Sequence, residues 1–476
     1  MTQEDELSLL REQVKQIPVL LEMIEGLQNQ VKELQDRLSK DSHNSSLPPS
    51  SDRFVRQKKP KSLRKTSDKQ VGGQPGHAGQ TLELSATPDQ VFALAPVTHC
   101  QHCQADVSET SAHTIERRQV IDVPAPRPEI IEYQAQWKCC PHCQGYTSAV
   151  FPATVSASVH YGPRLKAIAV YLLVQQLLPQ ARTADICAEV VGVRLAQASL
   201  VSWQADAANR LDPVERQIKA ALIQAPVIHQ DESGLYVLGK RWWVHATSTR
   251  HLTHYAAHPS RGATALQAIG IAPQFDGTSM HDAWSAYFQY EYGHGLCGVH
   301  LLRELTFLAE EHACTWANDL IALLVRMKQA ADVARRQHLW MVPSTELLEL
   351  LGAYDALLKA AEPLHPHILS PPGKRGRPKQ SPARNRLDRL LTRKAQVLAF
   401  LLDVQVPFDN NLAERDVRML KVQQKVSGTF RSEHGVVGFC RIRGYLSTLR
   451  KQGLHVLTAL EATFRGQPTL PSFKVL

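Results

Sequence analysis

Three acidic residues in distant segments have the side chains and surroundings for metal-dependent chemistry on phosphate. Asp231 and Asp282 each close a short strand-like run, and Glu414 lies at the start of a helix-like segment. Mg²⁺ prefers carboxylate oxygens, and two such ions can hold the attacking and leaving oxygens of an in-line phosphoryl displacement. The three carboxylates therefore predict a nucleic-acid strand-transfer site, provided that the fold brings them together.

A capping box is the alternative explanation for Glu414. Asn411 can accept hydrogen bonds at a helix start, and Glu414 would then occupy the third helical position. The positive helix end would also keep this carboxylate ionised, as a metal ligand must be. Taken alone, the motif favours capping, and only the two other carboxylates give weight to a metal site.

Four cysteines form two CxxC pairs, Cys100 with Cys103 and Cys140 with Cys143. Each pair offers two thiolates to one tetrahedral Zn²⁺, so the pattern predicts a structural zinc site. The alternating run 129–137 predicts β-strand between the pairs, as in a zinc ribbon. Four unrelated cysteines are the alternative. Paired CxxC units among nine cysteines favour metal in a reducing compartment over disulfides, so we expect a cytoplasmic protein.

A second possible ligand pair is Cys297 with His300, at the start of another helix-like segment. These side chains could reach a metal or a phosphate as accessory groups. A core cysteine and a helix-capping histidine are the favoured alternative.

The charge balance favours an acidic partner, because 54 Lys and Arg oppose 45 Asp and Glu and give a net charge of +9. Arg375 and Arg377 lie in an Arg-Gly-Arg-Pro sequence that resembles an AT-hook, a segment that lies in a narrow minor groove. Basic residues that follow Glu414 are expected to hold phosphate: Lys421, Lys425, Arg431, Arg441 and Arg443. No run is long and apolar enough to cross a membrane.

These residues must be positioned by several domains. The patterns predict a coiled-coil oligomerisation helix over 1–40, a basic flexible linker over 41–85, a zinc ribbon over 86–155, a helix-turn-helix-like DNA-binding domain over 160–215, a catalytic core over 220–300 and 406–476, and a helical insertion over 301–405. The coiled coil rests on apolar steps of four and three, with a kink or interruption expected near Pro18 and Gly26. A helix packed on its own chain is the alternative.

The predicted fold class is multidomain α/β. Strands over 227–231, 242–247 and 252–258 are followed by a helix over 263–269 and a strand that ends at Asp282. That β-β-β-α-β order, with acids closing the first and fourth strands, suits a ribonuclease-H-like core. Before it, a helix over 196–209 follows a turn that contains Gly192, which suits either a helix-turn-helix or a plain helical hairpin.

With these motifs in order, the chain resembles the zinc-finger-bearing DDE transposases of bacterial insertion sequences, the IS-sixty-six (TnpC-like) family. The resemblance covers nearly the whole chain and rests on these blocks: 44–52, 72–77, the two CxxC pairs, 161–163, Asp231-Glu232-Ser233, Asp282 with Tyr287, Cys297-x-x-His300 and 410–415. Ser233 stands where the family usually has Thr, and Leu47 where Lys is common.

The resemblance implies that Asp231, Asp282 and Glu414 are a DDE triad that binds Mg²⁺ or Mn²⁺. It implies cleavage at terminal inverted repeats of DNA and transfer to target DNA by a homo-oligomer, with accessory proteins of the same element as possible partners. Two other functions compete with this one. A zinc-dependent DNA-binding regulator with an inactive nuclease fold would bind without cutting, and a structure-selective nuclease would cut without joining.

Overall fold

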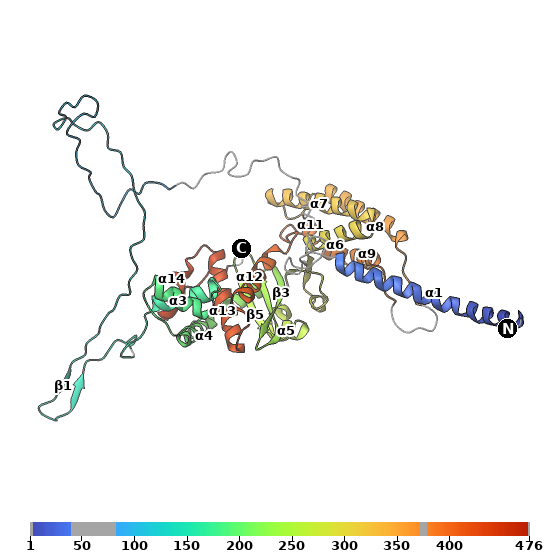
Figure 1. Cartoon of the computed structure of the whole chain (residues 1–476), viewed down its shortest axis with the longest axis horizontal. Helices are drawn as coiled ribbons and strands as arrows, with labels where there is room; N and C mark the ends of the chain where they lie inside the picture. The colour runs from blue at the N-terminus through green and yellow to red at the C-terminus, as the bar shows by residue number, and fades with distance from the viewer. Residues whose placement is uncertain (1–2, 40–81, 156, 371–377, 475–476) are drawn as a thin grey trace.

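The computed structural model describes residues 3–39, 82–155, 157–370 and 378–474. It is a mixed α/β structure in which one central sheet is surrounded by helices (Figure 1). Most of the predicted linker over 41–85, together with Arg375 and Arg377, lies outside the described residues.

The central sheet has the strand order β5-β4-β3-β6-β7. Its strands are β3 (Val227–Val237), β4 (Lys240–Ser248), β5 (Thr253–His258), β6 (Thr278–His281) and β7 (Gly293–Leu296). The pairs β3–β4 and β4–β5 are antiparallel, whereas β3–β6 and β6–β7 are parallel. The parallel crossover contains α5 (Ala263–Ile269), and it places the end of β6 beside the middle of β3.

Helices that precede the sheet in the chain and helices that follow it both pack on it. The preceding helices are α2 (Pro163–Val170), a π-helical turn (Tyr171–Gln175), α3 (Gln180–Val190) and α4 (Gln197–Ile223). The following ones are α12 (Asn411–Ser427), α13 (Glu433–Lys451) and α14 (Val456–Phe464). Helix α12 contacts β3 and β4, while α13 contacts β5 and α4. One hydrophobic core therefore joins segments that precede the sheet in the chain with segments that follow it.

The segment predicted to be a helical insertion consists mostly of helices and contains a second hydrophobic core. It contains α6 (Gly298–Glu311), α7 (Thr315–Arg336), α8 (Ser344–Ala361), α9 (Pro382–Thr392), α10 (Lys394–Val397) and α11 (Ala399–Leu402). A short 3₁₀ turn lies in the insertion at Glu362–Leu364, and two others precede the insertion, at Ala272–Gln274 and Tyr287–Gln289. The insertion leaves the sheet after β7 and returns at Phe408, whose carbonyl accepts a hydrogen bond from the Gly298 N–H at 2.8 Å.

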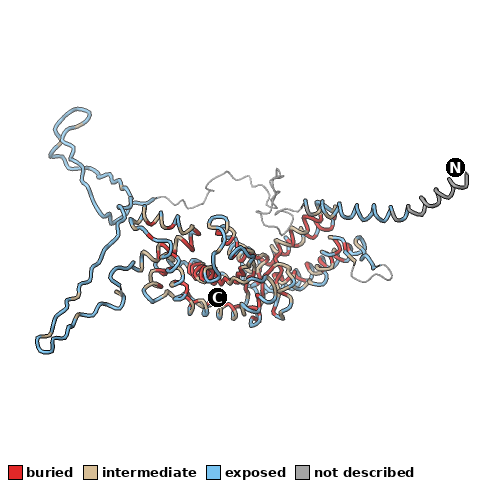
Figure 2. The backbone as a smooth tube through the Cα atoms, turned by 60° about the horizontal axis from the view of Figure 1, so that its bottom comes forward, coloured by how far each residue is buried: buried red, intermediate tan, exposed pale blue. Residues whose placement is uncertain are grey.

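The N-terminal helix α1 (Gln3–Ser39) is continuous, so the interruption expected near Pro18 and Gly26 is not observed. Its described apolar side chains, from Ile17 to Leu38, are exposed, and the helix projects from the body (Figure 2). Its last turns lie beside the insertion, where Lys379 forms an ion pair with Glu33 at 2.5 Å.

Residues 82–155 and 157–162 extend away from the body and carry little regular structure (Figure 1). The two strands there are β1 (Trp137–Cys139) and β2 (Tyr146–Ser148), which form a small hairpin. The prediction of a strand over 129–137 is therefore wrong except at Trp137, the first residue of β1. Ile130 and Ile131 are exposed and have no neighbouring strand in the described chain, and an alternating pattern alone cannot supply the partner that a strand needs.

Two further expectations are corrected. Helix α4 does not end at residue 209 but continues through Pro213 to Ile223, because Val214, Ile218 and Leu222 are buried in the main core. Asp231 does not close its strand, because antiparallel pairing with β4 extends β3 to Val237.

Candidate active site

The fold brings Asp231, Asp282 and Glu414 to one region. Asp231 lies in the middle of β3, Asp282 follows the last residue of the neighbouring parallel strand β6, and Glu414 lies in the first turn of α12. Burial raises the pKa of Asp231 well above its usual range, and the negative charges of Glu232, Asp282 and Glu414 raise it further. Charges influence one another in this way only at short range, so the three predicted carboxylates lie near one another.

Asp282 is also held in an environment that disfavours its charge. Burial and the neighbouring Glu232 raise the pKa of Asp282, although His300 and Arg261 act in the opposite direction. One of its oxygens accepts a hydrogen bond from the Trp284 N–H at 3.0 Å, which fixes the carboxylate at the end of β6.

Glu232 is a fourth carboxylate, and it has a different role. Adjacent residues of a strand point to opposite faces, and the Glu232 side chain bonds to Arg261 and Tyr287. Arg261 Nε donates to Glu232 Oε1 at 2.7 Å, and the Tyr287 hydroxyl donates to Oε2 at 2.7 Å. With only 1% of its side chain exposed, Glu232 is an internal anchor for Arg261. Its adjacency to Asp231 was visible in the sequence, but its partners were not.

A clasp formed by Asn410 fixes the start of α12 against the sheet. The buried Asn410 side chain donates through Nδ2 to the Gln230 carbonyl at 2.8 Å, and its Oδ1 lies 2.9 Å from His229 Nδ1. Burial lowers the pKa of His229 to about 4, so the ring is neutral and must donate through Nδ1. The Asn410 N–H also donates to the Cys297 sulfur at 3.2 Å. Glu414 is thereby fixed relative to β3, one turn into the helix.

The capping interpretation of Glu414 is wrong. Helix α12 begins at Asn411, so Asn410 is the capping residue, and it makes no side-chain cap hydrogen bond. Its amide is instead used in the clasp. Asn411 therefore cannot form a capping box with Glu414.

Cys297 and His300 lie on the first turn of α6 and face Glu414. The Cys297 sulfur is 3.8 Å from Glu414 Oε1, and His300 Nδ1 is 3.5 Å from the same oxygen. Cys297 is buried, as the favoured alternative expected, but His300 is turned toward Glu414 and does not cap α6. Among the described residues, these three form the only group of three or more metal-ligating side chains with ligand atoms within 4.8 Å of one another.

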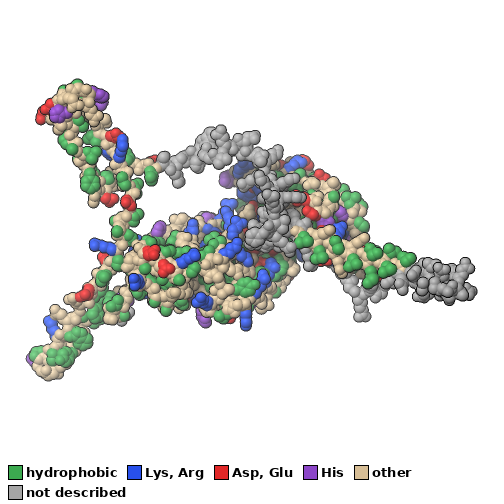
Figure 3. Space-filling model, in the orientation of Figure 1, with side chains coloured by type: hydrophobic (Ala, Val, Ile, Leu, Met, Phe, Trp, Pro, Cys, Tyr) green, Lys and Arg blue, Asp and Glu red, His purple; other side chains and the backbone are tan. Residues whose placement is uncertain are grey.

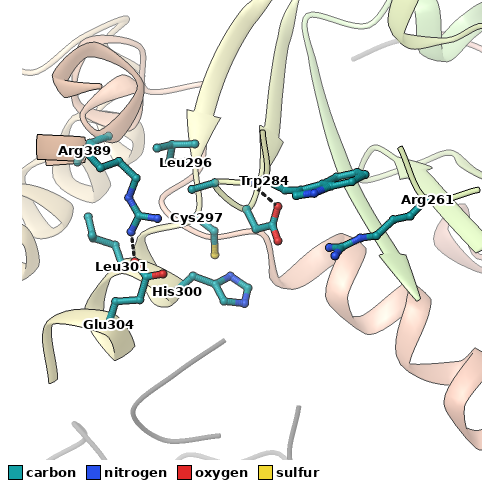
Figure 4. Close-up of a pocket in the computed structure, with 11 residues that line it drawn as sticks. Arg261, Trp284, Leu296, Cys297, His300, Leu301, Glu304 and Arg389 are labelled. Atoms are coloured by element: carbon teal, nitrogen blue, oxygen red, sulfur yellow. Dashed lines mark hydrogen bonds and ion pairs between the residues drawn. The ribbon is translucent and has the colours of Figure 1, made fainter. Parts of the chain in front are cut away.

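A recess of about 270 Å³ opens beside this group (Figure 4). It is lined on one side by Asp282, Trp284 and Arg261, and on the other by residues of the insertion. Organic ligands usually occupy pockets of about 300–1,000 Å³, so the recess suits ions, water and part of a phosphate backbone better than a buried small molecule.

The insertion contributes Glu304 and Arg389 to the far wall of the recess. Glu304 on α6 forms ion pairs with Arg386 at 2.9 Å and with Arg389, both on α9. Arg393 lies over the ring of Phe288 at 4.0 Å. The acidic Glu304 thus holds cationic side chains of the insertion beside the recess, and no sequence motif indicated this contact.

Arg261 and Trp284 of the near wall belong to a stack of alternating arginine and tryptophan side chains that continues beyond the recess. The Arg261 guanidinium lies over the Trp284 ring at 4.3 Å and the Trp243 ring at 5.0 Å, and Arg241 lies over Trp243 at 4.8 Å. Gly234 leaves the space for Arg241, because a Cβ there would be 3.1 Å from its guanidinium. We call this set, Arg241, Trp243, Arg261 and Trp284, the Arg–Trp ladder.

Basic residues continue along the Glu414 side of α12. Arg418, Lys421 and Lys425 follow Glu414 at steps of four, three and four, which places them on one face of the helix. Arg418 and Lys425 are exposed, as is Arg431 beyond the helix end, while the half-buried Lys421 donates to the Gly234 carbonyl at 3.1 Å. Figure 3 shows Lys and Arg side chains spread over the body.

Arg441 and Arg443 do not have the phosphate-binding role expected for them. Arg441 forms ion pairs with Glu215 at 2.5 Å and Asp212 at 2.9 Å. The buried Arg443 donates to the carbonyls of Val174 and Gln175. Both arginines attach α13 to preceding helices, and their proximity to Glu414 in sequence was misleading.

The two CxxC pairs have the same local geometry. In each, the residue after the second cysteine has a left-handed backbone, Gln104 at φ 61° and Gln144 at φ 58°, and its N–H donates to the carbonyl of the first cysteine at 2.9 Å. Backbone N–H groups that point at the first sulfur lower the pKa of Cys100 and of Cys140. Each turn fits half of a zinc site, although the four sulfurs do not meet in one group among the described residues.

The carboxylate group fits divalent metal. Asp231 and Asp282 are half-buried, like-charged and raised in pKa, and a bound cation would remove the repulsion between them. Oxygen ligands of this kind suit Mg²⁺ or Mn²⁺.

Comparison with known families gives two matches. A family model described as "Transposase IS66 family" matches residues 158–437, which is more than half of the 476-residue chain. A second model, described as a family of unknown function (DUF6444), matches residues 1–83. No curated protein matches the chain. Within the residues that the structure describes, no helix is long and apolar enough to span a membrane.

Proposed function

Because the chain belongs to the IS66 family of transposases, we propose that it cuts DNA at the ends of an insertion sequence and joins those ends to target DNA through Asp231, Asp282 and Glu414. Membership of the family makes it a DNA-processing enzyme. The finer proposal is supported by the influence of Asp282 and Glu414 on the charge of Asp231, which brings carboxylates from β3, β6 and α12 near one another. Asp282 also lines a recess together with Arg261 and Arg389.

The sheet supports a ribonuclease-H-like core. Three antiparallel strands are followed by a crossover helix and two parallel strands, in the order β5-β4-β3-β6-β7. In this arrangement Asp231 on the central strand and Asp282 on its parallel neighbour are adjacent, and the clasp at Asn410 adds Glu414 from the far side of the insertion.

In the proposed reaction, water attacks the phosphodiester at the end of the element and frees a 3′-hydroxyl, which then attacks a phosphodiester of target DNA. Bound Mg²⁺ or Mn²⁺ would activate the nucleophile and offset negative charge on the reacting phosphate. Asp231, Asp282 and Glu414 would hold the ions. Arg261 is kept beside Asp282 by Glu232 and would help to neutralise the phosphate.

Other parts of the chain would hold the DNA. We propose that the exposed Arg418, Lys425 and Arg431 track phosphates away from the site, together with Lys421. The turn between α3 and α4 supports a helix-turn-helix that reads the inverted repeats. Arg375 and Arg377 remain predicted minor-groove contacts.

The projecting elements would assemble the complex. The exposed apolar side chains of α1 support pairing with a second copy as a coiled coil, so that two element ends can be cut together. The matching geometry of the two CxxC turns supports a zinc ribbon in which one Zn²⁺ joins Cys100 and Cys103 to Cys140 and Cys143. Accessory proteins of the same element remain possible partners by family resemblance.

The decisive experiment replaces Glu414 with Gln and measures strand cleavage and joining on a labelled element end. We expect Glu414→Gln, Asp231→Asn and Asp282→Asn to fold and bind this DNA but to lose Mg²⁺-dependent cleavage. Glu433→Gln is the matched control, because Glu433 is an exposed acid in the first turn of α13. Cleavage by Glu414→Gln near the parent rate would reject the triad. Binding without cleavage by the parent would favour the alternative, a DNA-binding regulator with an inactive nuclease fold.

A further inference from the structure

The group formed by Cys297, His300 and Glu414 has a different chemistry from the three-carboxylate site that shares Glu414. Sulfur and imidazole ligands suit zinc and similar transition metals, whereas Mg²⁺ is bound through oxygen. The Glu414 carboxylate therefore belongs both to a ligand set that suits Mg²⁺ and to a ligand set that suits Zn²⁺.

The spacing of this group matches tetrahedral zinc. With Zn–N and Zn–O bonds of about 2.0–2.1 Å and a Zn–S bond of about 2.3 Å, tetrahedral geometry separates N from O by about 3.3 Å and S from O by about 3.5 Å. The observed separations from Glu414 Oε1 are 3.5 Å to His300 Nδ1 and 3.8 Å to the Cys297 sulfur. For these two separations an ion would need shifts of only a few tenths of an ångström, and the Cys297 sulfur lies within 4.8 Å of the His300 ligand nitrogen.

An independent observation indicates a missing partner at this place. His300 Nδ1 is a buried atom without a hydrogen-bond partner, and such an atom costs free energy unless something else satisfies it. The recess is lined by Cys297 and His300, so a fourth position of the ion would face the recess, where water or a DNA phosphate could occupy it. Three protein ligands and one position open to water or substrate are typical of zinc sites that are not purely structural.

We propose that Cys297, His300 and Glu414 form a second metal site, selective for Zn²⁺ over Mg²⁺, and that zinc at this site inhibits DNA cleavage by withdrawing Glu414 from the Mg²⁺ ligands. The inhibitory half rests on the proposed function of Glu414, while the binding half does not. On binding, the Cys297 thiol releases its proton to solvent and the sulfur ligates zinc as thiolate.

The binding half is tested by elemental analysis of full-length protein dialysed against zinc. We expect Cys297→Ser to hold one zinc per chain fewer than the parent, whether or not the CxxC turns are filled. Cys314→Ser is the matched control, because Cys314 is also buried and its sulfur is 3.8 Å from a histidine nitrogen, that of His365, without belonging to such a group. Asp282→Asn should retain the parent zinc content. Equal zinc in the parent and Cys297→Ser would overturn the site.

Co²⁺ substitution provides a second measurement. The thiolate-to-cobalt charge-transfer band should weaken in Cys297→Ser, and the cobalt d–d bands should change in His300→Gln, with no change in Cys314→Ser. If Cys297→Ser does not fold, as judged by its thermal melt, His300→Gln decides the question alone, and an unchanged cobalt spectrum and zinc content in that variant would overturn the proposal.

The inhibitory half is tested by adding Zn²⁺ to Mg²⁺-dependent cleavage and comparing each variant with itself without zinc. The zinc concentration for half-inhibition should rise at least about tenfold in His300→Gln, the usual order for loss of a metal-site group. Inhibition that is identical in parent and variant would overturn this half. If neither the parent nor any variant cleaves DNA, the proposed function fails. The binding half is still decided separately, by the difference in zinc content between the parent and Cys297→Ser.

Discussion

The side-chain amide of Asn410 donates a hydrogen bond to the backbone carbonyl of Gln230 at 2.8 Å, although the two residues are 180 positions apart in the chain. The bond joins the start of α12 to the residue that precedes Asp231. It therefore sets the position of Glu414 relative to Asp231 across the whole helical insertion.

Replacement of Asn410 by Ala should destabilise the protein and remove activity together. The Gln230 carbonyl and His229 Nδ1 would lose their partner, and each buried group left unsatisfied costs about 1–3 kcal/mol. We expect a loss of roughly 2–5 kcal/mol of unfolding free energy, measured by urea denaturation. Asn411→Ala is the control, since Asn411 is exposed and should change stability by less than about 0.5 kcal/mol. Equal effects of the two substitutions would contradict the clasp.

Asp231→Asn should make the metal-free protein more stable at neutral pH. Folded Asp231 holds its proton more tightly than the unfolded chain does, so this stability is present below about pH 4 and is lost as pH rises through the raised pKa. Asn carries no charge and can still accept from the Glu232 N–H, now bonded at 2.8 Å. A gain of about 0.5–2 kcal/mol is expected, measured as a higher melting temperature in chelator.

The same melts contain their own controls. Mg²⁺ should raise the melting temperature of the parent but not that of Asp231→Asn, because the variant lacks a ligand. The exposed Asp276→Asn should behave as the parent does. A lower melting temperature for metal-free Asp231→Asn than for the metal-free parent would contradict the prediction that the charged Asp231 carboxylate destabilises the fold.

The sequence was most informative where local signals agreed with packing. The helix predicted over 263–269 has the same bounds as α5, because Gly262 precedes it and Gly270, at φ 71°, ends it. The two aspartates and Glu414 could also be singled out as candidates, since the sequence places each of them at a predicted strand or helix. The helical character of 301–405 followed from its periodicity.

Contacts between distant segments were not predictable in this way. The extension of β3 beyond Asp231 depends on its pairing with β4, and the continuation of α4 through Pro213 depends on the buried Val214 and Ile218. Asn410 looked like part of a capping motif until the Gln230 carbonyl was seen to be its partner. Likewise, Arg441 and Arg443 are basic residues near Glu414 in sequence whose partners are internal.

Arg261→Ala should be strongly destabilising, because Glu232 has 1% of its side chain exposed and would keep its charge without its guanidinium partner. We expect a loss of roughly 2 kcal/mol or more, measured by urea denaturation. Adding Glu232→Gln to Arg261→Ala should restore part of that loss, since no buried charge would then remain. A double variant less stable than Arg261→Ala would contradict the anchoring role of Glu232.

Arg418→Ala and Lys425→Ala should weaken DNA binding mainly at low salt. Each lost phosphate contact lowers the slope of log K against log salt by about 0.9, so the double variant should lose about 2 units of slope. The exposed Arg465 on α14 is paired with Glu461, and Arg465→Ala should leave the slope unchanged. An unchanged slope in the α12 variant would mean that this helix face is only solvated.

Cys100→Ser combined with Cys103→Ser should reduce the zinc content by one ion per chain and loosen the region around Cys140. The expected cause is the loss of two of four thiolates. Cys139→Ser is the control, because this exposed thiol adjoins the second pair without belonging to it. Elemental analysis with limited proteolysis of residues 82–162 would measure both effects, and unchanged zinc in the double variant would reject these ligands.

The hydrogen bond between the Gly298 N–H and the Phe408 carbonyl has a consequence for the evolution and engineering of the enzyme. The chain leaves the central sheet and returns to it at neighbouring points, and the described residues between them fold around their own core. Length can therefore be gained or lost inside this segment without a change in the spacing of the three carboxylates. The junction is a natural grafting point, at which a foreign domain with close termini could be exchanged for the insertion.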